Sequence, residues 1–181
     1  MRHIVVHLIR GEAQIAHENI TKDLAEKFDS FPIHKRLQPH LTLKRWFESD
    51  VVDMEALDRA LGAYAESHKQ SDYELKGFDH FRTDVIYVNV ISTEETRANV
   101  RDLHTILHTV PNMTFDEYDD IDDDLHATVA MSALKAFDYD QIWNYLQAGP
   151  QPDFKMKFDN IALMRRETDK WEIVKVWELQ A

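Results

Sequence analysis

The chain has 181 residues, 44% of them hydrophobic, with only four glycines and five prolines. This size and composition suit one globular domain with an ordinary core and exclude a disordered or fibrous chain. The absence of cysteine excludes disulfides, zinc–thiolate sites and thiol nucleophiles, and it favours a reducing, cytoplasmic location. The net charge of -12 argues against binding long duplex nucleic acid, which depends on neutralising phosphates.

No apolar run approaches the length of a membrane-spanning helix, and the N-terminal stretch is too short for a signal peptide. We therefore expect no membrane association.

Hydrophobic patterns in the first half alternate between the periods of strands and helices. They predict a strand over 4–9, a helix over 13–28, a strand over 40–47, a helix over 52–66 and a strand over 73–81.

The second half repeats this order and adds one strand. The patterns predict a strand over 85–91, a helix over 94–108, a strand over 125–131, a helix over 139–147, and strands over 154–164 and 171–179. We expect an α+β fold in a single domain over 1–181, with two similar sheet-and-helix lobes around a central cleft. The repeat halves span about 1–82 and 83–181, and no linker separates them.

The third element of each half contains a His-x-Thr tripeptide: HLT at 40–42 and HAT at 126–128. Residues i and i+2 of a strand share a face, so each strand presents an imidazole and a hydroxyl side by side. Two such matches are weak by number alone, but both fall at the same phase of the repeat. From the residues alone, a pair of half-buried histidines bonded to backbone groups remains the alternative.

With PHLTLK at 39–44 and LHATVA at 125–130, the chain resembles the two-histidine (2H) phosphoesterase superfamily. The branch that it resembles is the LigT-like, or 2′-5′ RNA ligase, family of RNA 2′,3′-cyclic phosphodiesterases. The resemblance covers the whole chain, because the repeated order of elements matches the bilobal fold of that family. One position departs from the pattern: the LigT-like branch usually has an arginine three residues after the second threonine, where this chain has Met131.

The resemblance implies that His40 and His126 are catalytic and that Thr42 and Thr128 bind the substrate phosphate. Opening a cyclic phosphodiester needs a base that activates water and an acid that protonates the leaving oxygen. Two imidazoles suit these roles near neutral pH, and threonine hydroxyls can donate to the non-bridging oxygens. By the resemblance, His126 activates water and His40 protonates the leaving group, although the residues alone leave that order open.

Two basic features could extend the phosphate site. Lys44 follows Thr42 by two residues, so strand alternation predicts that it shares the face of His40 and Thr42. A lysine at the strand end that reaches solvent is the alternative. The HKR cluster at 34–36 could form a basic rim, or it could be an ordinary solvated loop.

Two features could bind a metal instead. The acidic run at 116–124 is interpreted as a solvated loop leading to His126, with a calcium or magnesium site as the alternative. Its carboxylates should raise the pKa of His126 if they lie close to it. His104 and His108 have metal-ligand spacing on a helix, but the glutamate of an HExxH motif is missing. We expect neither a metal nor a cofactor.

These observations predict a metal-independent phosphoesterase acting on 2′,3′-cyclic phosphate ends of RNA or on small cyclic nucleotides. The alternatives are a 2′-5′ oligonucleotide phosphodiesterase and a non-catalytic module that binds a nucleotide or an RNA end. The expected partner is a small nucleotide or RNA end, and we expect a monomer.

Overall fold

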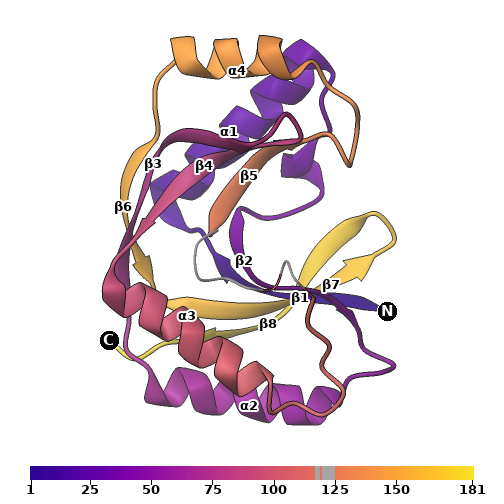
Figure 1. Ribbon diagram of the computed structural model, residues 1–181, viewed down its shortest axis with the longest axis vertical. Coiled ribbons are helices and arrows are strands. Elements are labelled where there is room, and N and C mark those ends of the chain that lie inside the picture. Colours follow the sequence, from indigo (N-terminus) through magenta and orange to yellow (C-terminus); the bar gives the residue numbers. More distant parts are fainter. Residues whose placement is uncertain (117–118, 120–124) are drawn as a thin grey trace.

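The structure is a computed structural model, and it describes residues 1–116, 119 and 125–181 (Figure 1). The first half contains β1 (Arg2–Leu8), α1 (Gly11–Phe28), the short 3-10 helix η1 (Ile33–Lys35), β2 (His40–Glu48), α2 (Met54–Ser67) and β3 (Ser71–Phe81). The second half contains β4 (Val85–Ser92), α3 (Glu94–Leu107), β5 (His126–Met131), α4 (Tyr139–Ala148), β6 (Asp153–Phe158), β7 (Asn160–Glu167) and β8 (Lys170–Glu178).

The strands form two four-stranded antiparallel sheets. The first sheet has the order β2-β1-β7-β8 and the second sheet has the order β5-β4-β3-β6. This confirms the predicted α+β fold. Each sheet combines strands from both halves of the chain, because β7 and β8 return to the first sheet and β3 belongs to the second.

One predicted strand was wrong. The segment 154–164 is two strands, β6 and β7, that separate at Asp159. β6 pairs with β3 in the second sheet, whereas β7 pairs with β1 in the first. Hydrophobic patterning could not locate this break, because apolar residues continue through both strands. The second half therefore adds two strands to the repeat rather than one.

Two helices pack against the sheet to which their preceding strand does not belong. α1 follows β1 of the first sheet but packs against β5 of the second, and α3 follows β4 of the second sheet but also packs against β2 of the first. Figure 1 shows α1 and α4 beside the second sheet, and α2 and α3 beside the first. No helix in the described part of the chain is long and apolar enough to span a membrane.

β1 has buried side chains on both of its faces, and these faces define the two sides of the first sheet. Val5 belongs to the main core, to which α2 and α3 also contribute. Ile4, Val6 and Leu8 belong to a smaller apolar cluster on the other side, together with residues of β7. Any residue paired with β1 can therefore be assigned to one side or the other.

Candidate active site

The first motif lies on β2, at the edge of the first sheet. His40 is paired with Leu8 and Thr42 with Val6. Directly opposed residues of an antiparallel pair project to the same face. The side chains of His40 and Thr42 therefore lie on the side of the smaller apolar cluster, away from the main core, and both are half-buried.

The second motif lies on β5, at the edge of the second sheet, in the matching arrangement. His126 is paired with Asn89 and Thr128 with Tyr87, whereas Ala127 faces the main core. The His126 ring contacts two aromatic neighbours that also contact each other, with centroid distances of 5.0 Å to Phe81 and 5.1 Å to Tyr87. His126 and Thr128 are half-buried, as their counterparts on β2 are.

The two motifs come together in space. β2 and β5 contact each other although they belong to different sheets. Burial lowers the pKa of His40, a hydrogen bond to Gln38 opposes this, and the positive charge of protonated His126 lowers the pKa further. Such coupling requires the two rings to be close, so the tertiary fold brings together the two histidines that the sequence singled out.

The backbone fixes the tautomer of His40. Its Nδ1 lies 2.7 Å from the carbonyl oxygen of Gln38, and a carbonyl can only accept, so Nδ1 carries a proton. The Nε2 atom is then the nitrogen that can gain or lose a proton. This orientation is the one that a general acid or base needs.

Lys44 does not lie where strand alternation predicted. β2 carries an extra residue, Leu43, between the pairs Thr42–Val6 and Lys44–Val5. This β-bulge shifts the phase of the alternation. Lys44 therefore lies on the face of Val5, opposite to that of Thr42, and the structure contradicts its assignment to the phosphate-facing row.

Lys44 instead forms a buried ion pair with Asp119. Its Nζ lies 2.8 Å from the carboxylate, and the two side chains are 2% and 3% exposed. Asp119 also accepts hydrogen bonds from the backbone N–H groups of Arg45 and Asp116. At Asp119 the solvated-loop interpretation of the acidic run is therefore wrong. Asp122, Asp123 and Asp124, whose charge was expected to act on His126, lie outside the described residues.

The basic cluster at 34–36 contacts the β7–β8 hairpin. Arg36 forms an ion pair with Asp169 and donates to its carbonyl oxygen, and its own carbonyl accepts from the Trp171 N–H. The Arg36 charge is therefore already matched within the protein.

His104 and His108 both contact Phe115, but their principal contacts differ. The Nε2 atom of His104 bonds to the Leu43 carbonyl oxygen at 3.2 Å, whereas the His108 ring stacks on Phe115 with centroids 3.7 Å apart. In the part of the chain that the structure describes, no group of three or more histidine and carboxylate side chains could hold a metal ion.

Sequence reasoning did not single out His17. It lies on α1 in a buried row of residues spaced three or four apart, Ala13, His17, Thr21 and Leu24. Its Nε2 bonds to the backbone carbonyl of Thr128 in the second motif, at 2.9 Å. The helical spacing could have predicted its burial, but not its contact with a strand more than a hundred residues away.

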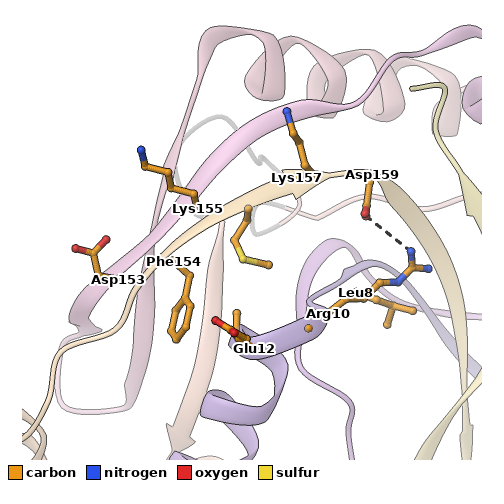
Figure 2. Close-up of a pocket in the computed structure, with 11 residues that line it drawn as sticks. Leu8, Arg10, Glu12, Asp153, Phe154, Lys155, Lys157 and Asp159 are labelled. Carbon is orange, nitrogen blue, oxygen red and sulfur yellow. Dashed lines mark ion pairs between the residues drawn. The ribbon is translucent and has the colours of Figure 1, made fainter.

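A pocket of about 520 Å³ lies between the start of α1 and β6, and no predicted site residue lines it. Figure 2 shows the side chains that line this pocket. Two of its cations are already paired, Arg10 with Glu178 at 2.7 Å and Lys157 with Asp72 at 2.6 Å. The pocket therefore offers little unmatched positive charge for a phosphate.

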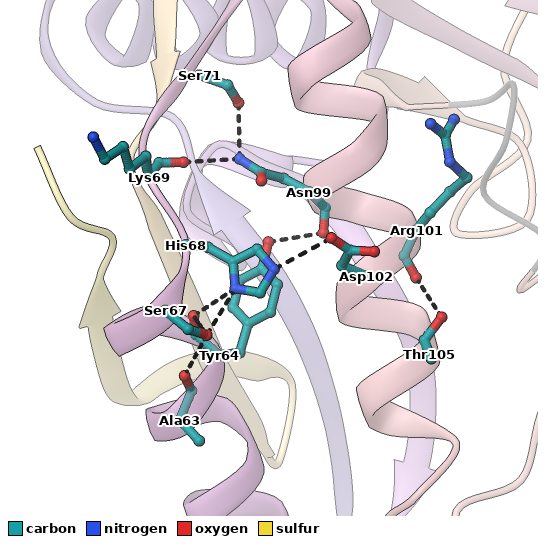
Figure 3. A network of polar contacts seen from close by, with 10 residues as sticks. All are labelled: Ala63, Tyr64, Ser67, His68, Lys69, Ser71, Asn99, Arg101, Asp102 and Thr105. Atoms are coloured by element: carbon teal, nitrogen blue, oxygen red, sulfur yellow. Dashed lines mark hydrogen bonds and ion pairs between the residues drawn. The ribbon is translucent and has the colours of Figure 1, made fainter.

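A second polar cluster, at the end of α2, superficially resembles a catalytic triad (Figure 3). The His68 ring lies between Ser67, at 3.1 Å from Nδ1, and Asp102, at 3.4 Å from Nε2. However, Nδ1 also lies 2.8 Å from the Tyr64 carbonyl, so it carries a proton and cannot accept one from Ser67. The cluster closes the end of a helix and is not an activated nucleophile.

Two edge strands, each from one of two antiparallel sheets, therefore carry the two His-x-Thr motifs. A family model for the 2′-5′ RNA ligase superfamily matches residues 12–170. The chain therefore belongs to the 2′-5′ RNA ligase superfamily. No curated protein matches it.

Solved structures share the fold at low sequence identity. The protein TT0787 of Thermus thermophilus is 16% identical with a TM-score of 0.60, covering 100% of this chain and 99% of its own. E. coli LigT complexed with 3′-AMP is 17% identical with a TM-score of 0.52, covering 99% and 98%. Usb1 of Kluyveromyces marxianus is 13% identical with a TM-score of 0.52, covering 99% and 98%. At these identities the likeness establishes the fold alone.

Proposed function

We propose that the protein is a metal-independent phosphoesterase that hydrolyses 2′,3′-cyclic phosphate ends of RNA or small cyclic nucleotides. The observation that carries this proposal is geometric: His40 and His126 lie on edge strands of different sheets, and these two strands contact each other. Family membership and the nucleotide named in the LigT complex, 3′-AMP, support a small nucleotide substrate.

The reaction needs one proton to leave the nucleophile and one to reach the leaving group. His126 removes a proton from water, whose oxygen attacks the phosphorus. The bond from phosphorus to one ribose oxygen breaks, and His40 Nε2–H protonates that oxygen. This assignment of roles follows the family resemblance alone, because the lowered pKa of His40 by itself favours the exchanged roles. In either role, the Nδ1–H bond to Gln38 leaves Nε2 as the reacting nitrogen of His40.

Thr42 and Thr128 would bind the phosphate. Each lies two residues after its histidine and shares a face with it. Their hydroxyls can donate to the non-bridging oxygens, where charge increases in the transition state. Lys44 is left out of this set, because it faces the other side and is paired with Asp119.

The experiment that tests this function is a substrate panel of 2′,3′-cyclic AMP, a cyclic-ended oligonucleotide and 2′-5′ oligoadenylate. We expect turnover of the cyclic esters, with the His40→Ala/His126→Ala double variant as the matched inactive control. Turnover of 2′-5′ oligoadenylate alone would favour the phosphodiesterase alternative. Binding of 3′-AMP without turnover of any ester would favour a binding module.

The same assay tests metal independence. Since the proposed acid, base and anion donors are all side chains, activity should survive EDTA and require no added divalent ion. Loss of activity on chelation, restored by adding back one metal ion, would contradict the mechanism and point to the acidic run as a metal site.

A further inference from the structure

Both motif strands lie at the edge of a sheet and contain a β-bulge. β2 and β5 are edge strands, so within the described residues the outward backbone groups of each lack a strand partner. Each strand also has a bulge directly after its motif threonine. Leu43 is the extra residue in β2, and Val129 is the extra residue in β5, between the pairs Thr128–Tyr87 and Ala130–Ile86. A bulge leaves ladder groups unpaired, and an unpaired buried carbonyl is costly.

A histidine donates a hydrogen bond to a backbone carbonyl at or directly before the bulge in each strand. On β5, the Thr128 carbonyl accepts from His17 Nε2–H at 2.9 Å. On β2, the carbonyl of the bulged Leu43 accepts from His104 Nε2–H at 3.2 Å. Both bonds lie at the motif threonine or at the residue that follows it.

Each of the two histidines lies on a helix that packs against the motif strand of the other half of the chain. His17 lies on α1, which follows β1 of the first sheet yet reaches the second motif. His104 lies on α3, which follows β4 of the second sheet yet reaches the first motif. Each half of the repeat therefore supplies the group that holds the motif strand of the other half.

Both imidazole rings are suited to donate a hydrogen bond while they stay neutral. Burial, and secondarily the charge of nearby His40, lowers the pKa of His17 to about 4. Burial also lowers the pKa of His104. A neutral imidazole can donate from Nε2 without adding a positive charge beside the two motif histidines.

We propose that His17 and His104 are positioning residues, which hold the two His-x-Thr strands in register by crossed hydrogen bonds from the helices. His17 positions the strand of His126 and Thr128, and His104 positions the strand of His40 and Thr42. This inference rests on the proposed function for its effect on turnover, but the crossed bonds can be tested without it.

The first test is kinetic. His17→Leu and His104→Leu, which remove the donor, should each lower kcat toward 2′,3′-cyclic AMP about 10- to 100-fold, with a smaller change in KM. His17→Gln and His104→Gln keep a donor of similar reach and should recover most of the loss. His3→Leu is the matched control, because His3 and His17 are each 5% exposed. The His3 ring bonds to the Met1 carbonyl and stacks on Phe47, at the end of β2 opposite to the first motif.

The second test is amide hydrogen exchange, which needs no substrate. His17→Leu should raise exchange in residues 126–131 more than in residues 40–48, and His104→Leu should show the reverse pattern. Uniform acceleration across the chain in both variants would indicate a general loss of stability and would overturn the inference. If a leucine variant does not fold, the asparagine variant, whose shorter side chain cannot reach the carbonyl, replaces it.

The outcomes separate the two proposals. A parent protein that turns over no ester would defeat the proposed function, and the exchange pattern would then decide the positioning role alone. An active parent whose His17→Leu and His104→Leu variants keep normal kcat, or lose no more than His3→Leu does, would overturn the inference while leaving the function intact.

Discussion

At the scale of single residues, the two motif histidines should carry most of the chemistry. His40→Ala or His126→Ala should each lower kcat about 10²- to 10⁴-fold, the range for losing a general acid or base. Thr42→Ala and Thr128→Ala should cost less, since each removes one neutral hydrogen bond. Turnover of the cyclic ester measures all four, with circular dichroism as the check on folding. Near-normal turnover in either histidine variant would contradict the mechanism.

The environment of His40 gives a second residue-scale prediction. Because burial and protonated His126 both lower its pKa, the His40 ring should titrate below the ordinary value of about 6.5. Removing the charge with His126→Ala should raise the midpoint. NMR titration of the His40 ring protons in both proteins measures this. An unchanged midpoint would mean that the two rings are not coupled.

At the scale of elements, the bulge in β2 turns Lys44 toward Asp119, with which it forms a buried ion pair. Asp119→Asn should leave the Lys44 charge buried and unpaired, at a cost of about 3–5 kcal/mol in unfolding free energy. Replacing both partners, as Lys44→Met with Asp119→Leu, should cost less than Asp119→Asn alone. Urea unfolding measures each variant.

An exposed pair provides the control for that experiment. Glu55 and Arg59 form an ion pair one helical turn apart, with side chains 92% and 70% exposed. Glu55→Gln should change stability by about 0.5 kcal/mol or less, because solvent screens the pair. If Asp119→Asn were equally mild, the buried pair would contribute little to the stability of the folded protein.

At the scale of the whole molecule, one buried histidine joins the two sheets. His7 of β1 donates from Nδ1 to the Asn160 carbonyl at 2.9 Å and accepts from the Tyr73 hydroxyl of β3 at 3.0 Å. Since each sheet also takes strands from both halves, we propose that residues 1–181 fold as one domain. Urea unfolding followed by tryptophan fluorescence and by circular dichroism should give coincident single transitions, and two separate transitions would contradict this.

The buried histidines should also make stability depend on pH. Burial lowers the pKa of His7 and of His17 to about 4. Between about pH 6.5 and 4 the unfolded chain binds protons that the folded protein does not, so stability should fall with decreasing pH. Each histidine contributes up to about 1.4 kcal/mol per pH unit.

Urea midpoints at pH 7.5, 6.0 and 5.0 measure this dependence. The His7→Gln variant, which cannot titrate there, should show a shallower decline than the parent. An equal decline would assign the acid sensitivity to other groups.

The sequence by itself determined the α+β class, nearly every element and the two His-x-Thr motifs. It could do so because hydrophobic periodicity and a repeated tripeptide are local properties of the chain. Tertiary structure alone decided the break at Asp159, the side that Lys44 faces and the pairing of Asp119 with it. It also decided the contacts of His17 and His104 with the opposite motif strands. These features depend on pairing register, on bulges and on helices that cross between sheets. All three involve contacts between residues that are far apart in the sequence, and local sequence patterns do not reveal such contacts.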